Sequence, residues 1–502
     1  MNQATQQEKT RRRALIIVAI ALALIAGAIL VLAMTDSSPP ATPRVTDETR
    51  SPSPRRNPPP RDLVARMQDA VTLEGVLQHL ETFQRIADNN GGNRYTATSG
   101  HERSVAYVAR VLRNAGYEVH FDRFDVTVYA ENAPSVLQRR APSRAAFEPG
   151  GDFTTFNFSP SGSVNGRVTP VAVDLGSVNS LGGCDSNAFS GFPNGDVALV
   201  QAGPCTLTEQ VVNAQDAGAS AALVLLTPEI ADTSRGVPRP SLASSDVDVP
   251  ALAVSAELGS RLARGEVRVH LEVDGDIAER TTRNVIAEQP GRTGDVLMVG
   301  AHLDSVADGP GINDNGSGTA SILELAVALA GAKTTEAVRF AFWSAEELGL
   351  VGSEHYVSEL SDAEKNRITA YLNFDMVASP NYMRLVYGDN PVSIENPAAI
   401  KNLFVDYFAE RDLDTELINL SGRSDHGPFE RAGIPVGGLF TGAEMTKDRA
   451  AARSFGGDPG APADPCYHLA CDDLDNVNVE SLDQMSDAIA FAVATLATSD
   501  DL

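Results

Sequence analysis

The feature that most constrains the fold is a series of short apolar segments in the C-terminal half of the chain, separated by segments with a helical pattern. Five apolar segments have the length and composition of buried strands: 296–301, 338–343, 370–374, 383–387 and 436–440. Helices are predicted at about 319–330, 349–359, 400–411, 425–432 and 479–495. Strands that alternate with helices indicate an α/β fold with a mixed, mostly parallel sheet sandwiched between helices.

The chain before this half is predicted to begin the same domain and then to leave it. Residues 63–87 and 100–115 predict two amphipathic helices, and residues 117–126 alternate like a half-buried strand. From about residue 129 to residue 280, short strands and frequent turns indicate a small, mainly β domain. We therefore expect one α/β domain, formed by residues 63–130 and 281–502, that is interrupted by a second domain of residues 131–280.

The N-terminus carries a candidate membrane segment. A basic tail, residues 1–13, precedes Ala14–Met34, which has no charged or strongly polar residue and is long enough to cross a bilayer. The basic tail predicts a cytoplasmic N-terminus, with the rest of the chain outside the cytoplasm. An uncleaved anchor is favoured over a cleaved signal, which would make the protein secreted. Residues 35–62, rich in Pro and Ser, are predicted to be a disordered linker.

Charge and cysteine usage exclude several classes of function. The formal net charge of −26 argues against nucleic acid as a partner of the folded part, and no obligate protein partner is evident. The four cysteines form two local pairs, Cys184 with Cys205 and Cys466 with Cys471, and no C-x-x-C motif occurs. A thiolate metal site is therefore disfavoured, and two short-range disulfides are expected in an exported chain.

Acidic residues, histidines and one tyrosine follow the ends of the predicted strands: His302, Asp304, Asp314, Glu346, Glu347, Asp375, and the pair Tyr467-His468 in the last long loop. Each alone has an ordinary explanation, such as a helix cap or a solvated helix start. Because parallel strands carry their carboxyl ends to one edge of the sheet, five of these residues are expected to converge: His302, Asp314, Glu347, Asp375 and His468. Imidazole and carboxylate ligands with one shared carboxylate suit two zinc ions.

The inserted segment resembles the protease-associated domain. The sequence 196–205 predicts a strand that ends in Gly203-Pro-Cys205, and Asn213-Ala-Gln-Asp-Ala-Gly218 lies in the helix that follows. The resemblance implies an insertion without chemistry of its own, which usually shapes access of substrate. Cys184 and Cys205 would then form a disulfide within it.

The α/β part resembles the co-catalytic zinc aminopeptidases of the M28 peptidase family, most closely the secreted leucine-type enzymes of bacteria. The motifs that carry the resemblance are His302-Leu-Asp-Ser-Val306, Gly311-Ile-Asn-Asp-Asn-Gly-Ser-Gly318, Trp343-Ser-Ala-Glu-Glu-Leu-Gly349, Leu372-Asn-Phe-Asp-Met376, Gly422-Arg-Ser-Asp-His-Gly-Pro-Phe429 and Cys466-Tyr-His-Leu-Ala-Cys471. It implies a phosphorylase/hydrolase-like zinc-exopeptidase fold. It also implies hydrolysis of peptides that have a free, apolar N-terminal residue.

The resemblance implies a ligand set for two zinc ions. His302 and Asp375 would bind one ion, Glu347 and His468 would bind the other, and Asp314 would bridge both. In this family the peptide bond after the bridging residue is often cis.

Other residues would complete the catalytic site. Glu346 would be the general base for the attacking water, and Tyr467 would donate a hydrogen bond to the oxyanion. Asp304 would fix the tautomer of His302, and Arg423 would contact the substrate backbone.

Three further assignments concern structure. The resemblance implies a disulfide between Cys466 and Cys471 that braces the loop of the second histidine ligand. Neither His355 nor His426 matches a ligand position of the family, and we assign both of them structural roles.

Two other functions compete with an aminopeptidase. Carboxypeptidases and dipeptidases of the same family share the zinc ligands, so the ligands do not separate them. A non-catalytic, transferrin-receptor-like ectodomain would also have an anchor, a linker, a protease-associated domain and a peptidase-like domain. In that type the ligands are eroded, whereas here all five candidate ligands are present.

Overall fold

The structure is a computed structural model, and it describes residues 60–174, 181–227, 236–242, 247–388 and 397–499. The predicted basic tail, the membrane segment Ala14–Met34 and the linker up to residue 59 lie outside the described residues. Within them, no helix is both long enough and apolar enough to cross a membrane.

The α/β part is built on a mixed sheet with mostly parallel pairs, as predicted. Its strands are β8 (Arg268–Gln289), β9 (Val296–His302), β10 (Ala337–Trp343), β11 (Ile368–Phe374), β12 (Leu385–Tyr387), β13 (Glu416–Ile418) and β14 (Val436–Phe440). Their order is β13-β12-β14-β11-β9-β10-β8. Strand β9 pairs in parallel with β10 and β11, and β11 pairs in parallel with β14. Strands β8 and β12 are antiparallel to β10 and β14.

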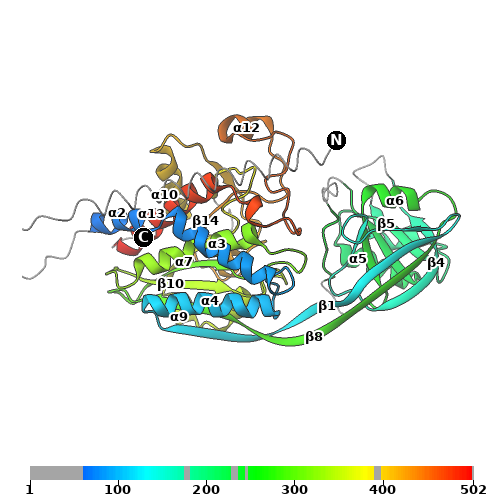
Figure 1. Ribbon diagram of the computed structural model, residues 1–502, viewed down its shortest axis with the longest axis horizontal. Coiled ribbons are helices and arrows are strands. Elements are labelled where there is room, and N and C mark those ends of the chain that lie inside the picture. Colours follow the sequence, from blue (N-terminus) through cyan, green and yellow to red (C-terminus); the bar gives the residue numbers. More distant parts are fainter. Residues whose placement is uncertain (1–59, 175–180, 228–235, 243–246, 389–396, 500–502) are drawn as a thin grey trace, which may run out of the picture. The chain divides into compact units, whose positions relative to one another are not determined.

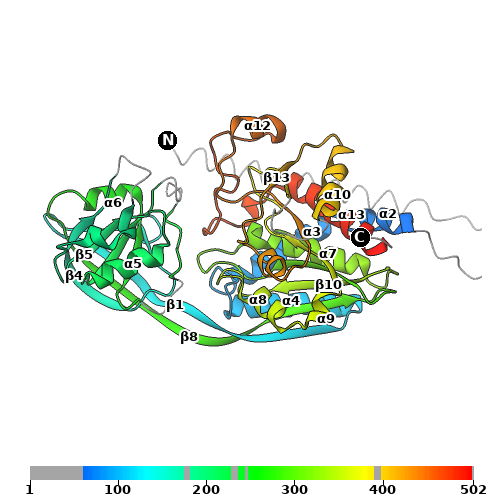
Figure 2. The ribbon, with the colours of Figure 1, turned by 180° about the vertical axis from the view of Figure 1, so that it is seen from behind.

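Helices cover both faces of this sheet, since β9 is buried on both sides. Its residues Leu297 and Val299 belong to one apolar cluster, and Val296 and Met298 belong to another. The first cluster includes α2 (Pro60–Ala70), α3 (Leu73–Asp88), α4 (Ser99–Ala115), α7 (Gly318–Leu329), α10 (Pro397–Ala409) and α13 (Val479–Thr498). The second includes α8 (Val351–Glu359) and α11 (His426–Arg431). Figure 1 is seen from the side of α3 and α4, and Figure 2 from the opposite side.

Two predicted elements differ from the structure in extent. The helix predicted at 63–87 is two helices, because Thr72 adopts an extended conformation and its side chain caps α3 through the N–H of Gly75. The strand predicted at 117–126 corresponds to the first third of β1 (Val119–Ala141). The short elements β13, α9 (Asp362–Lys365) and α12 (Arg449–Phe455) have no counterpart among the predicted ones.

Strands β1 and β8 form a long antiparallel ribbon (Figure 1). Their pairing runs from Val119 opposite Ala287 to Ala141 opposite Arg268, with three register shifts. The domain boundaries predicted after residues 130 and 280 therefore fall inside two continuous strands and not in loops.

The inserted part contains the strand predicted at 196–205 and the helix predicted to follow it. Strands β4 (Gly162–Val171), β5 (Val197–Gln201), β6 (Ala221–Leu225) and β7 (Ala251–Val254) are parallel neighbours, with β3 (Phe153–Thr155) antiparallel at the edge. The same part contains helices α5 (Leu207–Asp216) and α6 (Ala256–Leu262). The predicted disulfide between Cys184 and Cys205 is present, and it ties the chain before β5 to the start of α5.

Candidate metal centre

Three neighbouring strands deliver most of the predicted site residues to one edge of the sheet. His302 is the last residue of β9, Glu346 and Glu347 follow β10, and Asp375 follows β11. Because these strands are adjacent and parallel, their carboxyl ends meet. Asp314 reaches the same place from the turn between β9 and α7. His468 reaches it from the long loop between β14 and α13, as the strand pattern led us to expect.

The turn that carries Asp314 has an unusual backbone. Gly311 adopts a left-handed conformation, with φ of 62°, and the peptide bond between Asp314 and Asn315 is cis, as the family resemblance led us to expect. Gly318 lies against the carbonyl oxygen of Phe374, and a Cβ atom there would lie 2.1 Å from that oxygen. The glycine is therefore required for α7 to begin this close to β11.

The carboxylate of Asp314 lies between the two histidines. Its Oδ1 is 3.1 Å from Nε2 of His302, and its Oδ2 is 3.2 Å from Nε2 of His468. Asp375 Oδ1 lies 3.3 Å from Nε2 of His302, and Glu347 Oε2 lies 3.1 Å from Nε2 of His468. The five predicted ligands thus form two groups that share Asp314, and each group has its ligand atoms within 4.8 Å of one another.

The chemistry of these groups suits divalent cations. The carboxylate oxygens Glu347 Oε1 and Asp375 Oδ1 are buried and have no hydrogen-bond partner. Burial disfavours a charged imidazole, but the carboxylates of Glu346 and Asp375 outweigh it and raise the pKa of His302 well above its ordinary value. Burial opposes the charged form of His468 as well, and Glu347 and Asp314 raise its pKa. Without metal, protons therefore take the place of cations, and metal binding must release them.

Glu346 stands beside the ligand groups at a greater distance. Its Oε2 is 4.0 Å from Nε2 of His302. Burial, followed by the nearby charges of Glu347, Asp425 and Asp375, raises its pKa well above the ordinary value, although His302 acts in the opposite direction. A carboxyl group with a raised pKa is suited to exchange a proton near neutral pH.

Asp304 mainly organises the Glu346-Glu347 turn. Its Oδ1 accepts the N–H of Glu346 at 3.3 Å, and its Oδ2 accepts the N–H of Glu347 at 3.4 Å. Nδ1 of His302 is 3.1 Å from the main-chain oxygen of Asp304 but 3.8 Å from its carboxylate. The main-chain oxygen of Asp304 thus favours the His302 tautomer that leaves Nε2 free for a metal ion. The Asp304 side chain instead holds the turn that carries Glu346 and Glu347.

Thr96, which the sequence argument did not consider, completes this arrangement. Its hydroxyl donates to Asp304 Oδ2 at 2.9 Å and accepts the N–H of Ala345 at 3.0 Å. Ala345 has a positive φ of 61°. A residue from the segment between α3 and α4 therefore fixes the strained turn that carries the two glutamates.

Ser424 is a second residue that the sequence argument missed. Its hydroxyl donates to Asp375 Oδ2 at 2.6 Å and accepts from Asn373 Nδ2 at 2.9 Å. This bond holds one carboxylate oxygen of Asp375 and leaves the other, Oδ1, facing His302. Both Ser424 and Asn373 lie in motifs that carried the family resemblance, and these motifs are the sequence feature that could have identified them.

Tyr467 and Arg423 lie at the rim of the site. The ring of Tyr467 stacks on the ring of His468, with 3.8 Å between centroids. Burial and the charges of Asp314 and Glu347 raise the pKa of the Tyr467 hydroxyl, so it remains a hydrogen-bond donor. Arg423 Nη1 donates to Glu444 Oε1 at 2.6 Å, so this guanidinium is already paired. The predicted disulfide between Cys466 and Cys471 is present on either side of Tyr467-His468.

A cavity of about 730 Å³ opens onto the two ligand groups. Its wall near the metal groups is polar and includes Glu346, Tyr467 and Arg423. The remaining wall includes several apolar side chains: Leu350, Met376, Ile418, Leu420, Phe440 and Met445. The site thus combines a cluster of charged groups with apolar side chains that line the same cavity.

His355 and His426 lie outside the two ligand groups. His355 Nε2 is 3.2 Å from Asp122 Oδ1, and its ring packs on Phe124. His426 accepts the N–H of Gly422 at 3.2 Å, and burial lowers its pKa to about 4. His426 also lines the cavity, and a structural role for both histidines stays a prediction.

Two protein families match the chain. The family described as peptidase family M28 matches residues 284–493, which include all the predicted site residues. The family described as the PA domain matches residues 165–262, inside the predicted insertion.

Curated relatives and a solved structure resemble the chain over most of its length. An aminopeptidase of Pseudomonas aeruginosa is 40% identical and covers 86% of this chain and 82% of its own length. A probable leucine aminopeptidase 2 of Aspergillus fumigatus is also 40% identical, covering 86% and 83%. The structure of BSAP, a zinc aminopeptidase from Bacillus subtilis, is 23% identical with a TM-score of 0.65, covering 86% of this chain and 97% of that one.

Proposed function

The chain belongs to peptidase family M28 and is a metallo-aminopeptidase with a protease-associated domain, and from this premise we propose how its site works. The enzyme uses two zinc ions to remove apolar N-terminal residues from peptides. His302 and Asp375 would hold one ion, Glu347 and His468 would hold the other, and Asp314 would serve both.

One observation carries this proposal. The two oxygens of Asp314 face two different histidines, at 3.1 and 3.2 Å, and each histidine has a further carboxylate beside it. A single ion would need only one of these groups. Counting Glu346, four carboxylates line the site, and their combined charge can balance that of two divalent cations.

The roles of the other residues follow from their positions. When bound, the zinc ions supply the positive charge that makes water nucleophilic and polarises the scissile carbonyl. Glu346 takes the proton of the attacking water and passes it to the leaving amine. Asp304 and Thr96 hold the turn from which Glu346 projects. Tyr467 donates a hydrogen bond to the oxyanion, and Arg423 contacts the substrate backbone at the rim.

Charge in the cavity favours recognition of a free amine over a free carboxylate. Among the described residues that line it, the cations other than histidine are Arg423 and Arg431, and each pairs with an acid, Glu444 or Glu354. A carboxypeptidase needs a cation for the substrate carboxylate. The acidic groups that the cavity offers suit a protonated N-terminus instead.

The preference for an apolar first residue rests on apolar side chains that line the cavity. Ile418, Leu420, Phe440 and Met445 line it. Burying an apolar side chain of the substrate there contributes about 1.5–3 kcal/mol. A charged first residue would lose its hydration without a partner among these four side chains.

The proposal also includes a location. Ala14–Met34 anchors the chain in the cell membrane, with the enzyme outside the cytoplasm, or directs secretion if it is cleaved. The two predicted disulfides that the structure contains suit an oxidising compartment. The N-terminal residue of the protein isolated from cells distinguishes anchor from cleaved signal.

The central test compares Glu346→Gln with the natural protein on a peptide that begins with leucine and on the same peptide with an acetylated N-terminus. We expect the natural protein to release leucine only from the free peptide, and the variant to lose about 10²- to 10⁴-fold in kcat. Zinc content should be two equivalents in both proteins, because Glu346 is not a proposed ligand. The exposed Glu359→Gln on α8 is the matched control.

Three results would contradict the proposal. Full activity of Glu346→Gln would remove the assigned base. Equal cleavage of the acetylated peptide would exclude recognition of the free amine. A content of one zinc or less, unchanged after zinc is added, would reject the pair of ions.

A further inference from the structure

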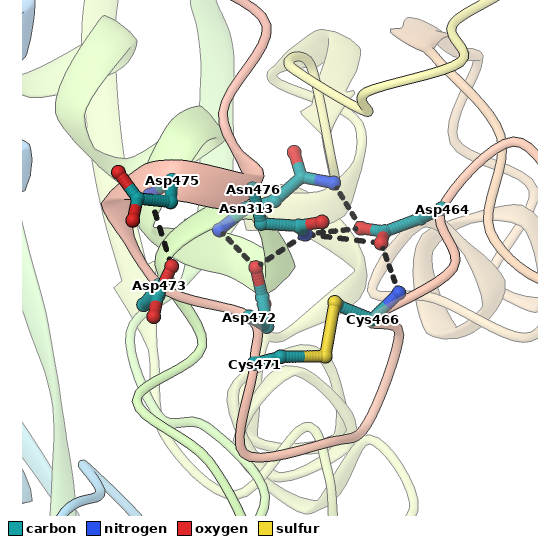
Figure 3. Close-up of a disulfide and its surroundings, with 8 residues drawn as sticks. All are labelled: Asn313, Asp464, Cys466, Cys471, Asp472, Asp473, Asp475 and Asn476. Carbon is teal, nitrogen blue, oxygen red and sulfur yellow. Dashed lines mark hydrogen bonds between the residues drawn. A yellow bond between two sulfur atoms is a disulfide. The ribbon is translucent and has the colours of Figure 1, made fainter. Parts of the chain in front are cut away.

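Two buried carboxylates flank the disulfide loop that carries His468, and the proposed chemistry uses neither of them. Asp464 precedes Cys466 and is 2% exposed, and Asp472 follows Cys471 and is 1% exposed. Figure 3 shows both carboxylates turned toward Asn313, the residue before Asp314. Burying two carboxylates this close to each other is costly unless strong hydrogen bonds compensate it.

Asp472 binds the main chain of the turn that carries Asp314. Its Oδ1 accepts the N–H of Asn313 at 2.9 Å, and its Oδ2 accepts the N–H of Asp314 at 2.9 Å. In addition, the N–H of Ile312 donates to the main-chain oxygen of Asp472 at 3.0 Å. Three consecutive amides of the turn are thus held by one residue, 158 positions later in the chain.

Asp464 reaches the same turn through side chains. Its Oδ2 accepts from Asn313 Nδ2 at 2.6 Å, and its Oδ1 accepts the N–H of Cys466 at 2.8 Å. Asn476 Nδ2 lies 3.0 Å from both Asp464 Oδ1 and Asp472 Oδ1, and so joins the two acids. The network therefore closes around the base of the disulfide loop (Figure 3).

These acids are not a cation site of their own. Each carboxylate oxygen of Asp464 and Asp472 accepts at least one N–H, and neither residue belongs to a group of described residues that could hold a metal ion. Their hydrogen-bonding capacity is directed at the protein.

We propose that Asp472, supported by Asp464, is the positioning residue that sets the Asp314 carboxylate against His468. The inference rests on the proposed function, in which Asp314 bridges two zinc ions. A bridging ligand must satisfy both ions at once, so an error of about 0.5 Å in its backbone position affects both bonds. Asp472 fixes the backbone of Asp314 directly. Because it follows Cys471, it also ties that backbone to the short loop that carries His468.

The test uses Asp472→Asn in the full-length protein. The change preserves shape but replaces one oxygen by an NH₂ group, which then faces a main-chain N–H of the turn. Asp475→Asn is the matched control, since Asp475 lies in the same acidic stretch but is exposed. Asp464→Asn is the second variant, and its effect should be smaller because it reaches the turn only through side chains.

Three measurements are needed. They are the affinity of the metal-free protein for Zn²⁺, the rise in melting temperature on adding Zn²⁺, and the absorption spectrum with Co²⁺. We expect Asp472→Asn to bind Zn²⁺ about 10- to 100-fold more weakly than the natural protein does. Its melting temperature should rise less on addition of Zn²⁺, and its absorption spectrum with Co²⁺ should differ from that of the natural protein. Asp475→Asn should match the natural protein in all three.

The inference is overturned if Asp472→Asn loses stability equally with and without Zn²⁺ while its Zn²⁺ affinity matches that of Asp475→Asn, because the residue would then be only structural. If Asp472→Asn does not fold, the stability and Zn²⁺ affinity of Asp464→Asn are compared with those of Asp475→Asn instead, and the same outcome overturns the inference. Failure of the natural protein to bind two Zn²⁺ would instead refute the proposed function, so the two failures are distinguishable.

Discussion

Replacing Ser424 by alanine removes the hydroxyl that holds one oxygen of Asp375 and changes little else. The Ser424 hydroxyl donates to Asp375 Oδ2 at 2.6 Å in a site where Ser424 is 8% exposed. Asn373 Nδ2, which donates to the same hydroxyl, keeps the hydroxyl of Tyr387 as an acceptor at 3.1 Å. The substitution therefore acts mainly on the freedom of the Asp375 carboxylate.

The size of the effect follows from the kind of bond that is lost. A hydrogen bond to a charged group contributes about 1.5–3 kcal/mol. Since about 1.4 kcal/mol corresponds to a factor of ten, losing this bond should weaken binding of the ion that we propose for His302 and Asp375 by about 10- to 100-fold. The ion that we propose for Glu347 and His468 should be affected less, because the hydrogen bonds of the Ser424 side chain go to Asp375 and Asn373 and not to these two residues.

Competition with a chromogenic zinc chelator measures both affinities in one titration. Ser421→Ala, an exposed serine of the same loop, is the control, and Ser424→Thr should restore binding because it keeps the hydroxyl. At saturating zinc, the activity of Ser424→Ala should recover most of the natural value. The reasoning is refuted if Ser424→Ala and Ser421→Ala bind both ions equally well.

Two further predictions concern residues that contact the turn carrying Glu346 and Glu347 or the residues next to it. Thr96→Val removes the hydroxyl between Asp304 and the N–H of Ala345, so we expect kcat to fall about tenfold with KM unchanged; steady-state kinetics check this, and a change confined to KM would contradict it. Burial, followed by the charges of Arg94 and Arg283, lowers the pKa of His101 from 6.5 to about 3. Below pH 6.5 the unfolded chain binds a proton that the folded protein does not. His101 therefore contributes stability above pH 6.5 that is lost as the pH falls toward 3, with a slope of up to about 1.4 kcal/mol per pH unit. In urea unfolding of the metal-free protein, the free energy of unfolding should depend less steeply on pH in His101→Gln than in the natural protein. Equal slopes in the two proteins would exclude this role of His101.

The central sheet could be predicted because its strands are apolar on both faces. Segments such as 296–301 and 436–440 differ by at most one residue from β9 and β14. The break between α2 and α3 was missed, because Thr72 lies within a continuous amphipathic pattern and only its extended backbone reveals the cap. Strand β13 was missed because it has three residues and an exposed edge, which leave no periodic signal.

The candidate ligands could be predicted because their side-chain types at strand ends already specify the chemistry. The residues that hold them could not, because Ser424, Thr96 and Asp472 act through hydrogen bonds that carry no signature of their own. The bond from Thr96 to Asp304 spans 208 positions, and its donor is an ordinary threonine in a connecting segment. The role of Asp304 toward the Glu346-Glu347 turn is likewise visible only when main-chain donors are located.

The ribbon of β1 and β8 explains how a second domain can be accommodated without disturbing the catalytic one. Ala130 is the pairing partner of Asp276, so the chain leaves and returns at points a single strand spacing apart. A gap of that width is closed by a two-residue hairpin turn. The insertion is thus equivalent, for the rest of the fold, to a lengthened β-hairpin loop. A gene could gain, lose or exchange this module in one recombination event while the strand register that leads to the metal centre stayed the same.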